Sequence, residues 1–306
     1  MRLSICIPTF NRSERLRACL SSIDAATFYV SEPIEVLVYD NASEDDTQAV
    51  LESWTFHNPM VQFRPLLNPT NLGVVGNIKK LASHSLGDYL LWCTDDDIVL
   101  PRGVMHALDV IDRFQPNFAK MGLITYLERS KSAFYYGVAT DQINIGGDLE
   151  PFAQAFRFSH VLTGCIVSRR SGILEKAAEI ENVYPSALWC ALGFESTYFC
   201  AEPFSVHVEE NETFWELDVD VSSAIAKEEH LNRDFQAALN YLTMDVRDKP
   251  GVDKLLETMI SVGYRLDPSI RRLLTSRSSY VFRLFVIKFK TLSIFKRILS
   301  RIRRGI

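Results

Sequence analysis

The chain has 306 residues, of which 47% are hydrophobic and 23% are charged, and its formal net charge is −5. This length is enough for one large domain or two smaller ones with a full hydrophobic core. The balance of apolar and charged residues excludes wholesale disorder, collagen-like repeats and a polytopic membrane protein, and no apolar stretch reaches the ~18 residues of a membrane-spanning helix.

Six cysteines are scattered along the chain without a C-x-x-C pair. This spacing disfavours a zinc ribbon or a disulfide scaffold and predicts reduced thiols in a cytoplasmic protein. Residues 1–7 are a short apolar run that meets Pro8 at once, with no cleavage site of small residues, so we do not expect a signal peptide.

The first 130 residues alternate between apolar runs and amphipathic segments. We expect strands at 3–7, 34–39, 61–66, 88–93 and 121–127. We expect helices at 12–23, from a Ser43 cap to about 56, at 73–85 and from Pro101 onward. This order predicts an α/β fold with a mostly parallel sheet flanked by helices. Beyond 130 the pattern is less regular, and a turn-rich segment at 141–148 is expected to lie over the site.

We divide the chain into a domain at 1–215, with halves at 1–127 and 128–215, and a helical region at 216–306. The tail, residues 271–306, holds 11 Lys and Arg and no Asp or Glu, which leaves 22 basic against 38 acidic residues elsewhere. Its apolar residues recur at helical spacing, typical of an interfacial helix on anionic lipid. The alternative is a helix packed on the body or in a homo-oligomer. The acidic body argues against nucleic acid as a partner.

Three consecutive carboxylates, Asp95, Asp96 and Asp97, follow an apolar strand directly. Two carboxylates about 6 Å apart repel by about 3 kcal/mol at an effective dielectric of 20, so three at the edge of a core are unfavourable without a cation. A bound Mg²⁺ or Mn²⁺ would remove this repulsion and bridge to substrate phosphates. The alternative is an acidic loop in which Asp97 caps the next helix.

Other polar residues also lie where the strands end. Ligands of parallel α/β sheets bind beyond the carboxyl ends of the strands, where Asp40 can accept a hydrogen bond from a ribose or a base. Asn71 and Gly73 enter a helix whose backbone donors can meet an anion. The residues that end the first strand, with a turn and helix cap as the alternative role, are Thr9, Asn11 and Arg12. A Walker lysine and G-x-G-x-x-G spacing are both missing, which excludes P-loop and Rossmann dinucleotide sites.

Together these segments resemble glycosyltransferase family 2, the inverting nucleotide-sugar enzymes of the GT-A fold. The resemblance covers about the first 110 residues and rests on SICIPTFNR at 4–12, VYDNASEDDT at 38–47, NLG at 71–73, GDYLLWCTDDD at 87–97 and LP at 100–101. More weakly, 160–215 resembles O-antigen sugar transferases of the abequosyltransferase type.

The resemblance implies roles for the residues at the strand ends. Pro8, Thr9 and Asp40 would contact the base and ribose of the donor nucleotide, with Arg12 close to them. The other residues assigned to the nucleotide site are Asn11, Asn71, Gly73 and Asp95.

The resemblance also implies a metal site and a general base. Asp96, with Asp95 or Asp97, would hold Mn²⁺ or Mg²⁺ on the donor diphosphate. Some GT-A enzymes complete the metal shell with a late histidine, for which His207 is the candidate, although a lone histidine is more often structural. Many family members carry a Glu-Asp or Asp pair in the acceptor half, and residues 181–200 lack it. The substitutes for the base are Glu195 and then Glu181.

The expected function is transfer of a sugar from a UDP-, dTDP-, GDP- or CDP-sugar to a polysaccharide or a lipid-linked saccharide of the bacterial surface-glycan type. The expected location is the inner face of the plasma membrane, with the protein bound peripherally. Two alternatives stay open. One is another metal-phosphate enzyme, such as a nucleotidyltransferase or a phosphohydrolase. The other is a non-catalytic glycan-assembly protein that retains the nucleotide pocket.

Overall fold

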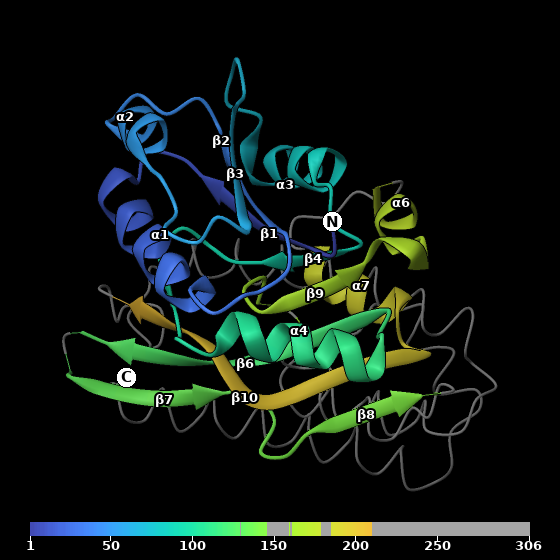
Figure 1. Ribbon diagram of the computed structural model, residues 1–306. Coiled ribbons are helices and arrows are strands. Elements are labelled where there is room, and N and C mark those ends of the chain that lie inside the picture. Colours follow the sequence, from blue (N-terminus) through green and yellow to red (C-terminus); the bar gives the residue numbers. More distant parts are fainter. Residues whose placement is uncertain (129, 146–158, 160, 179–184, 210–306) are drawn as a thin grey trace, which may run out of the picture. The chain divides into compact units, whose positions relative to one another are not determined.

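A computed structural model of the protein describes residues 1–128, 130–145, 159, 161–178 and 185–209 (Figure 1). In these residues no helix combines the length and the apolar character that crossing a bilayer requires. The predicted helical region at 216–306, its basic tail and Glu181 lie outside the described residues, so those predictions stay predictions.

The described strands and helices alternate through the first half of the chain and become less regular after it. The strands are β1 (Leu3–Thr9), β2 (Ile34–Asp40), β3 (Val61–Leu67), β4 (Tyr89–Trp92), β5 (Asp97–Val99), β6 (Phe118–Leu127), β7 (Ser132–Tyr136), β8 (Gln142–Ile145), β9 (Cys165–Ser168) and β10 (Ser196–Glu209). The helices are α1 (Ser13–Thr27), α2 (Thr47–Ser53), α3 (Gly73–His84), α4 (Gly103–Phe114), α6 (Ile173–Ala178) and α7 (Pro185–Leu192), with a 3₁₀ turn η1 (Arg169–Ser171).

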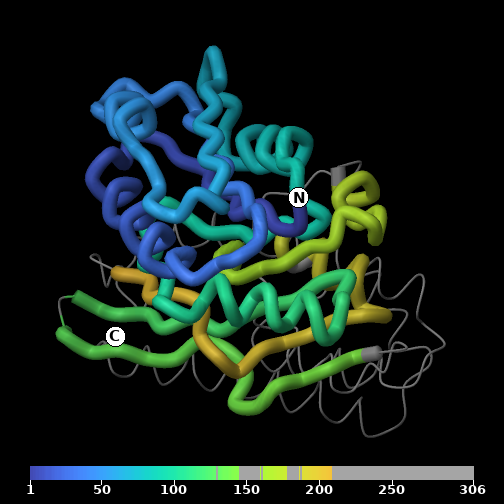
Figure 2. Tube along the Cα trace, in the orientation of Figure 1, coloured from blue at the N-terminus to red at the C-terminus, as the bar shows by residue number. Residues whose placement is uncertain are grey.

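One central sheet has the strand order β3-β2-β1-β4-β9-β6-β10-β5, and β7 and β8 pair with β6 and β10. The first four strands in this order run parallel. Beyond β4 the sheet is mixed, because β9 enters antiparallel to both β4 and β6. Figure 2 follows the chain from the blue β1–β3 part to the β6–β10 part. The predicted α/β fold, a sheet flanked by helices, is confirmed.

The helices cover the sheet because their apolar residues recur at helical spacing. On α1 the buried side chains are Leu16, Cys19, Leu20 and Ile23, which share one core with Leu3, Ile5 and Ile7 of β1. Each fully buried Leu or Ile side chain contributes about 1.5–3 kcal/mol. Figure 1 shows α1 and α2 on one side of β1–β3 and α3 on the other. Helices therefore cover both faces of the sheet next to the edge where β1, β2 and β4 end.

Two predicted helix starts are wrong. Ser43 does not cap α2, because its hydroxyl donates to Asp40 and α2 begins only at Thr47. The fourth helix begins at Gly103 rather than Pro101, because the short strand β5 and a turn come between the aspartates and the helix.

The segment predicted to cover the site is also placed elsewhere. Residues 142–145 form β8 and pair with the first residues of β10. Asp141 accepts hydrogen bonds from the Tyr198 hydroxyl and the Ala201 amide. These contacts tie the described part of 141–148 to the start of β10, away from the strand ends that carry Asp40 and Asp96.

The six cysteines are all free and buried, as the spacing predicted.

The aromatic residues near β10 are part of the core. Trp189 stacks on Trp92 with ring centroids 4.9 Å apart, and Tyr198 stacks on Phe114 at 4.4 Å.

Candidate active site

The loops that follow β1 and β2 meet at the carboxyl edge of the sheet. Thr9 and Asp40 are register partners as the last residues of their strands, and the Asn41 amide donates to the Thr9 carbonyl oxygen at 3.0 Å. Pro8 lies one position earlier, opposite Tyr39. The structure thus brings the predicted nucleotide residues Pro8, Thr9 and Asp40 to one edge.

Asp40 is fully buried, and only one of its carboxylate oxygens is used. Oδ1 accepts hydrogen bonds from the Ser43 amide at 3.1 Å and the Ser43 hydroxyl at 2.5 Å. Oδ2 is buried and has no hydrogen-bond partner within the described part of the chain. A buried polar atom left unpaired costs about 1–3 kcal/mol, so this oxygen suits a ligand that brings an N–H or O–H group.

Asn11 joins the two loops. Its backbone has φ 52°, a left-handed conformation that Asn tolerates better than most residues. Its amide donates to Ser43 Oγ at 2.8 Å, and its side-chain oxygen accepts from the Glu44 amide at 2.7 Å. The predicted nucleotide-site residue Asn11 therefore shapes the loop beside Asp40.

Asparagine side chains fasten α3 to the end of β2. Asn41 Nδ2 donates to Asn71 Oδ1 at 2.8 Å, and Asn68 Nδ2 donates to Asn41 and Asn77 at 3.0 Å. The Gly73 amide donates to Asn71 Oδ1 at 2.8 Å, at a residue with φ 70° that favours glycine. Asn71 and Gly73 thus shape the entry to α3, and their predicted contact with an anion stays a prediction.

Asp97 is held by donors from three parts of the chain. Its Oδ2 accepts hydrogen bonds from the Thr94 hydroxyl at 2.5 Å and from the Thr163 hydroxyl, and its Oδ1 lies 3.0 Å from His207 Nδ1. Behind this group, buried Lys120 donates to the Thr163 carbonyl oxygen; burial lowers the pKa of Lys120. Asp97 is the first residue of β5, so the alternative role as a helix cap is wrong.

Asp96 is the partly exposed member of the triplet and is surrounded by cations. Its Oδ2 lies 2.5 Å from Arg12 Nη1 and 3.7 Å from Arg15 Nη1, and its Oδ1 lies 3.9 Å from His207 Nδ1. Burial opposes ionisation, but the charges of His207 and Arg12 outweigh it and lower the pKa of Asp96. Asp96 is thus kept as a carboxylate.

Asp95 is the buried neighbour of this group. Burial, followed by the charge of Asp96, raises its pKa to about 6. Arg12 Nη1 lies 3.2 Å from its Oδ1, so a single guanidinium contacts both Asp95 and Asp96.

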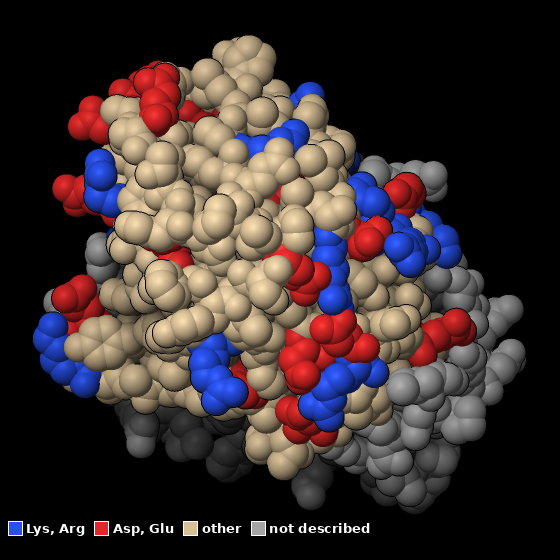
Figure 3. All heavy atoms as spheres, viewed as in Figure 1, with Lys and Arg blue, Asp and Glu red and all other residues tan. Residues whose placement is uncertain are grey.

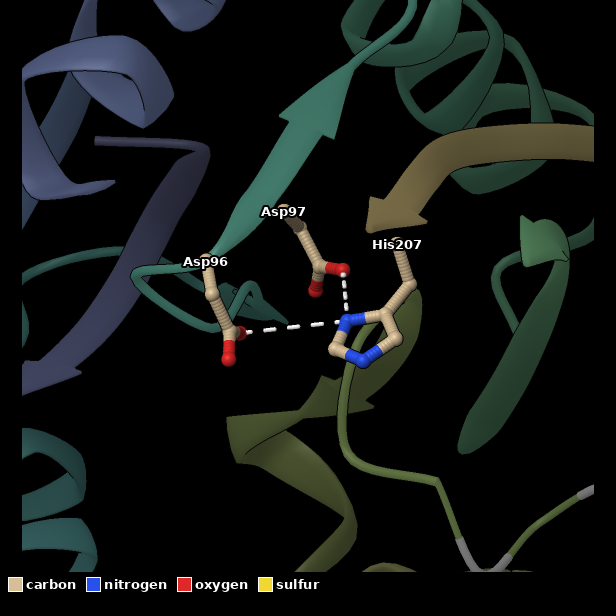
Figure 4. A group of neighbouring side chains, drawn as sticks. All are labelled: Asp96, Asp97 and His207. Carbon is tan, nitrogen blue, oxygen red and sulfur yellow. Dashed lines mark hydrogen bonds and ion pairs between the residues drawn. The ribbon is translucent and has the colours of Figure 1, made fainter. Parts of the chain in front are cut away.

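Asp96, Asp97 and His207 form a group that could hold a metal ion. One ligand atom from each lies within 4.8 Å of the other two. Figure 4 shows the two carboxylates and the imidazole ring converging from the start of β5 and the end of β10. Carboxylate oxygens suit Mg²⁺ and Mn²⁺, and imidazole is a common transition-metal ligand. The donor set therefore fits a divalent cation.

Of the two predicted bases, only Glu195 lies in the described part of the chain, and it is not brought to this group. Glu195 is exposed in the turn before β10, whereas His207 lies near the end of that strand. A strand advances about 3.3 Å per residue, so most of the length of β10 separates them. Glu195 was chosen from its neighbours in the sequence, and the direction of β10 places it at the other end. Glu181 lies outside the described residues.

Several residues that hold the aspartates in place were not predicted from the sequence. They are Thr94, Thr163, Lys120 and Arg15. Thr163 lies two residues before the start of β9. The antiparallel register of β9 with β4 pairs Leu91 with Ile166 and so carries position 163 toward position 94. On the face shown in Figure 3, Lys and Arg are interspersed with Asp and Glu and form no patch of one sign.

The domain that carries this site matches a known protein family. Residues 4–176 match the family model described as Glycosyl transferase family 2. The chain belongs to glycosyl transferase family 2. The match begins within β1 and ends within α6, so it includes Asp40 and all three aspartates.

Two curated relatives of this family 2 chain are named for a glycosyltransferase activity. The chain is 35% identical to an abequosyltransferase of Salmonella typhimurium over 99 residues, 32% of this chain and 28% of that protein. It is 29% identical over 100 residues to a GalNAc(5)-diNAcBac-PP-undecaprenol beta-1,3-glucosyltransferase of Campylobacter jejuni, 32% of this chain and 31% of that protein. The chain thus spans about a third or less of the length of these relatives.

A solved structure has the same fold as the described part of this family 2 chain. It is the mannosyltransferase PcManGT from Pyrobaculum calidifontis in complex with GDP-Man and Mn²⁺. The TM-score is 0.53 at 14% identity, covering 98% of this chain and 82% of that chain. The predicted GT-A fold is therefore confirmed.

Proposed function

We propose that this protein is a metal-dependent inverting glycosyltransferase that moves a sugar from a nucleotide-sugar donor to a saccharide or lipid-linked saccharide acceptor. One observation supports the proposal: in a family 2 domain, the Asp96, Asp97 and His207 group lies at the same edge of the sheet as Asp40, whose buried Oδ2 has no partner among the described residues. A diphosphate linked to a nucleoside needs both a cation and a polar contact for the base or ribose.

Each residue has a distinct task in this mechanism. Asp96, Asp97 and His207 would hold Mn²⁺ or Mg²⁺, which when bound neutralises charge that grows on the leaving diphosphate. Asp40 would accept a hydrogen bond from the nucleoside through Oδ2. The acceptor hydroxyl attacks the anomeric carbon from the face opposite the diphosphate, so one displacement inverts that carbon. The hydroxyl proton must pass to a base. Among the described residues, the predicted base is Glu195, and it does not lie near the aspartates.

The relatives support the classes of donor, metal and acceptor. The mannosyltransferase of the same fold binds GDP-Man and Mn²⁺, and the Campylobacter relative is named for a lipid-linked acceptor. UDP-, dTDP-, GDP- and CDP-sugars are therefore the donors to screen, and undecaprenol-linked saccharides are the acceptors.

A donor screen tests the proposal. At 100 times its Kd, a ligand adds about 2.7 kcal/mol of stability, so one nucleotide sugar should raise the Tm by several degrees with Mn²⁺ and less without it. Turnover should release a nucleoside diphosphate and form a new glycoside. Release of pyrophosphate or inorganic phosphate would instead indicate a nucleotidyltransferase or a phosphohydrolase. Binding without turnover on any acceptor would indicate a non-catalytic assembly protein.

Asp40→Asn should weaken binding of the donor and of its nucleoside diphosphate by about 10- to 100-fold, because hydrogen bonds to a charged acceptor are worth about 1.5–3 kcal/mol. Mn²⁺ affinity measured without nucleotide should not change, since Asp40 is not one of the three metal-group residues. Isothermal titration calorimetry measures both. Equal nucleotide affinity in the wild type and the variant would remove Asp40 from the site.

A further inference from the structure

Arg12 pairs with Asp96, one of the two carboxylates of the metal group, and with its neighbour Asp95. Its Nη1 lies 2.5 Å from Asp96 Oδ2 and 3.2 Å from Asp95 Oδ1. Arg12 is the residue immediately before α1, and 43% of its side chain is exposed. One half-exposed guanidinium thus pairs with two neighbouring carboxylates.

A divalent cation and this guanidinium compete for Asp96. The metal group uses one oxygen from Asp96, one from Asp97 and one nitrogen from His207, all within 4.8 Å. Asp97 Oδ2 is taken by two hydroxyl groups, so Asp96 is the ligand with the most freedom to turn. A cation bound to Asp96 would repel the Arg12 guanidinium at short range. The side chain of Arg12 is 43% exposed and that of Asp96 is 13% exposed, so the guanidinium is the group that has room to move away.

The displaced guanidinium has a natural new partner in the proposed reaction. Guanidinium groups bind phosphate oxygens through two parallel hydrogen bonds, and a metal-bound donor places its diphosphate beside Asp96. We propose that Arg12 is a displaceable counter-ion: it holds Asp95 and Asp96 in the metal-free protein and transfers to the donor diphosphate when metal binds. This inference rests on the proposed function and extends it, because it makes metal and donor bind cooperatively.

The test measures Mn²⁺ affinity without any donor, from the electron paramagnetic resonance signal of free Mn²⁺. Arg12→Gln removes the competing cation, so Mn²⁺ alone should bind about tenfold more tightly than to the wild type. Saturating UDP and saturating GDP are tested separately. The fold-increase in Mn²⁺ affinity caused by the nucleotide that binds should be at least about fivefold smaller in the variant than in the wild type.

Arg17→Gln is the matched control. Arg17 lies on α1, the helix that follows Arg12, is exposed and carries the same charge. It has no contact with the three aspartates in the structure described, so both affinities should stay within about twofold of the wild type. Circular dichroism checks that each variant is folded. If folded Arg12→Gln binds Mn²⁺ no more tightly than the wild type, the counter-ion role is overturned. If the wild type itself binds neither Mn²⁺ nor a nucleotide, the proposed function fails instead.

Discussion

Asp96→Asn should abolish tight Mn²⁺ binding and reduce sugar transfer by about 1000-fold or more, because the metal carries the charge of the leaving diphosphate in the transition state. The neutral amide offers a weaker metal ligand than the carboxylate. It also loses its ion pair with Arg12 at 2.5 Å. Asp96 is the partly exposed member of the aspartate triplet, so the substitution should leave the fold intact.

The measurements for Asp96→Asn are Mn²⁺ titration and the rate of product formation under saturating donor. The matched control is Asp109→Asn on α4, which removes an exposed ion pair with Arg113 that does not involve the aspartate triplet. That control should keep full metal affinity and rate. A folded Asp96→Asn protein that transfers sugar at a rate within tenfold of the wild type would exclude a metal at this group.

Glu35→Ala should lower the free energy of unfolding by about 3–5 kcal/mol, the usual cost of removing one partner from a buried ion pair. Glu35 on β2 is fully buried. Its carboxylate accepts hydrogen bonds from Arg64 of β3, from the Ser4 hydroxyl of β1 and from the Leu86 amide at 2.8 Å. The substitution leaves all three donors without this acceptor and opens a cavity.

Urea denaturation measures this loss, and Glu32→Ala is its control. Glu32 is 36% exposed and pairs with Arg2 at 3.3 Å, and such pairs contribute about 0–1 kcal/mol. The two substitutions remove the same side chain in neighbouring segments, so the difference between them reports burial. Similar losses for both variants would mean that the Glu35 contacts contribute little.

The local sequence was sufficient for the first half of the sheet. Strands such as Leu3–Thr9 and Ile34–Asp40 are buried on both faces and read as continuous apolar runs, which is the pattern of parallel strands covered by helices. The polar residues that follow them fall at the carboxyl edge whatever the details of packing. Asp40 and the aspartate triplet were therefore found from composition and position alone.

Pairings between distant strands decided which atoms those residues contact. His207 meets Asp97 only because β10 runs antiparallel to β5 with these two residues in register, and Thr163 meets Asp97 only because β9 turns back along β4. The same topology places Glu195 at the other end of β10. Short-range periodicity reports which face of a strand is buried. It carries no information about the neighbouring strand, since that depends on contacts between residues 66 and 110 positions apart. The sequence alone thus determined that this chain has a strand-end cluster of carboxylates, and the tertiary structure alone decided which hydroxyls, cations and imidazole hold that cluster in place.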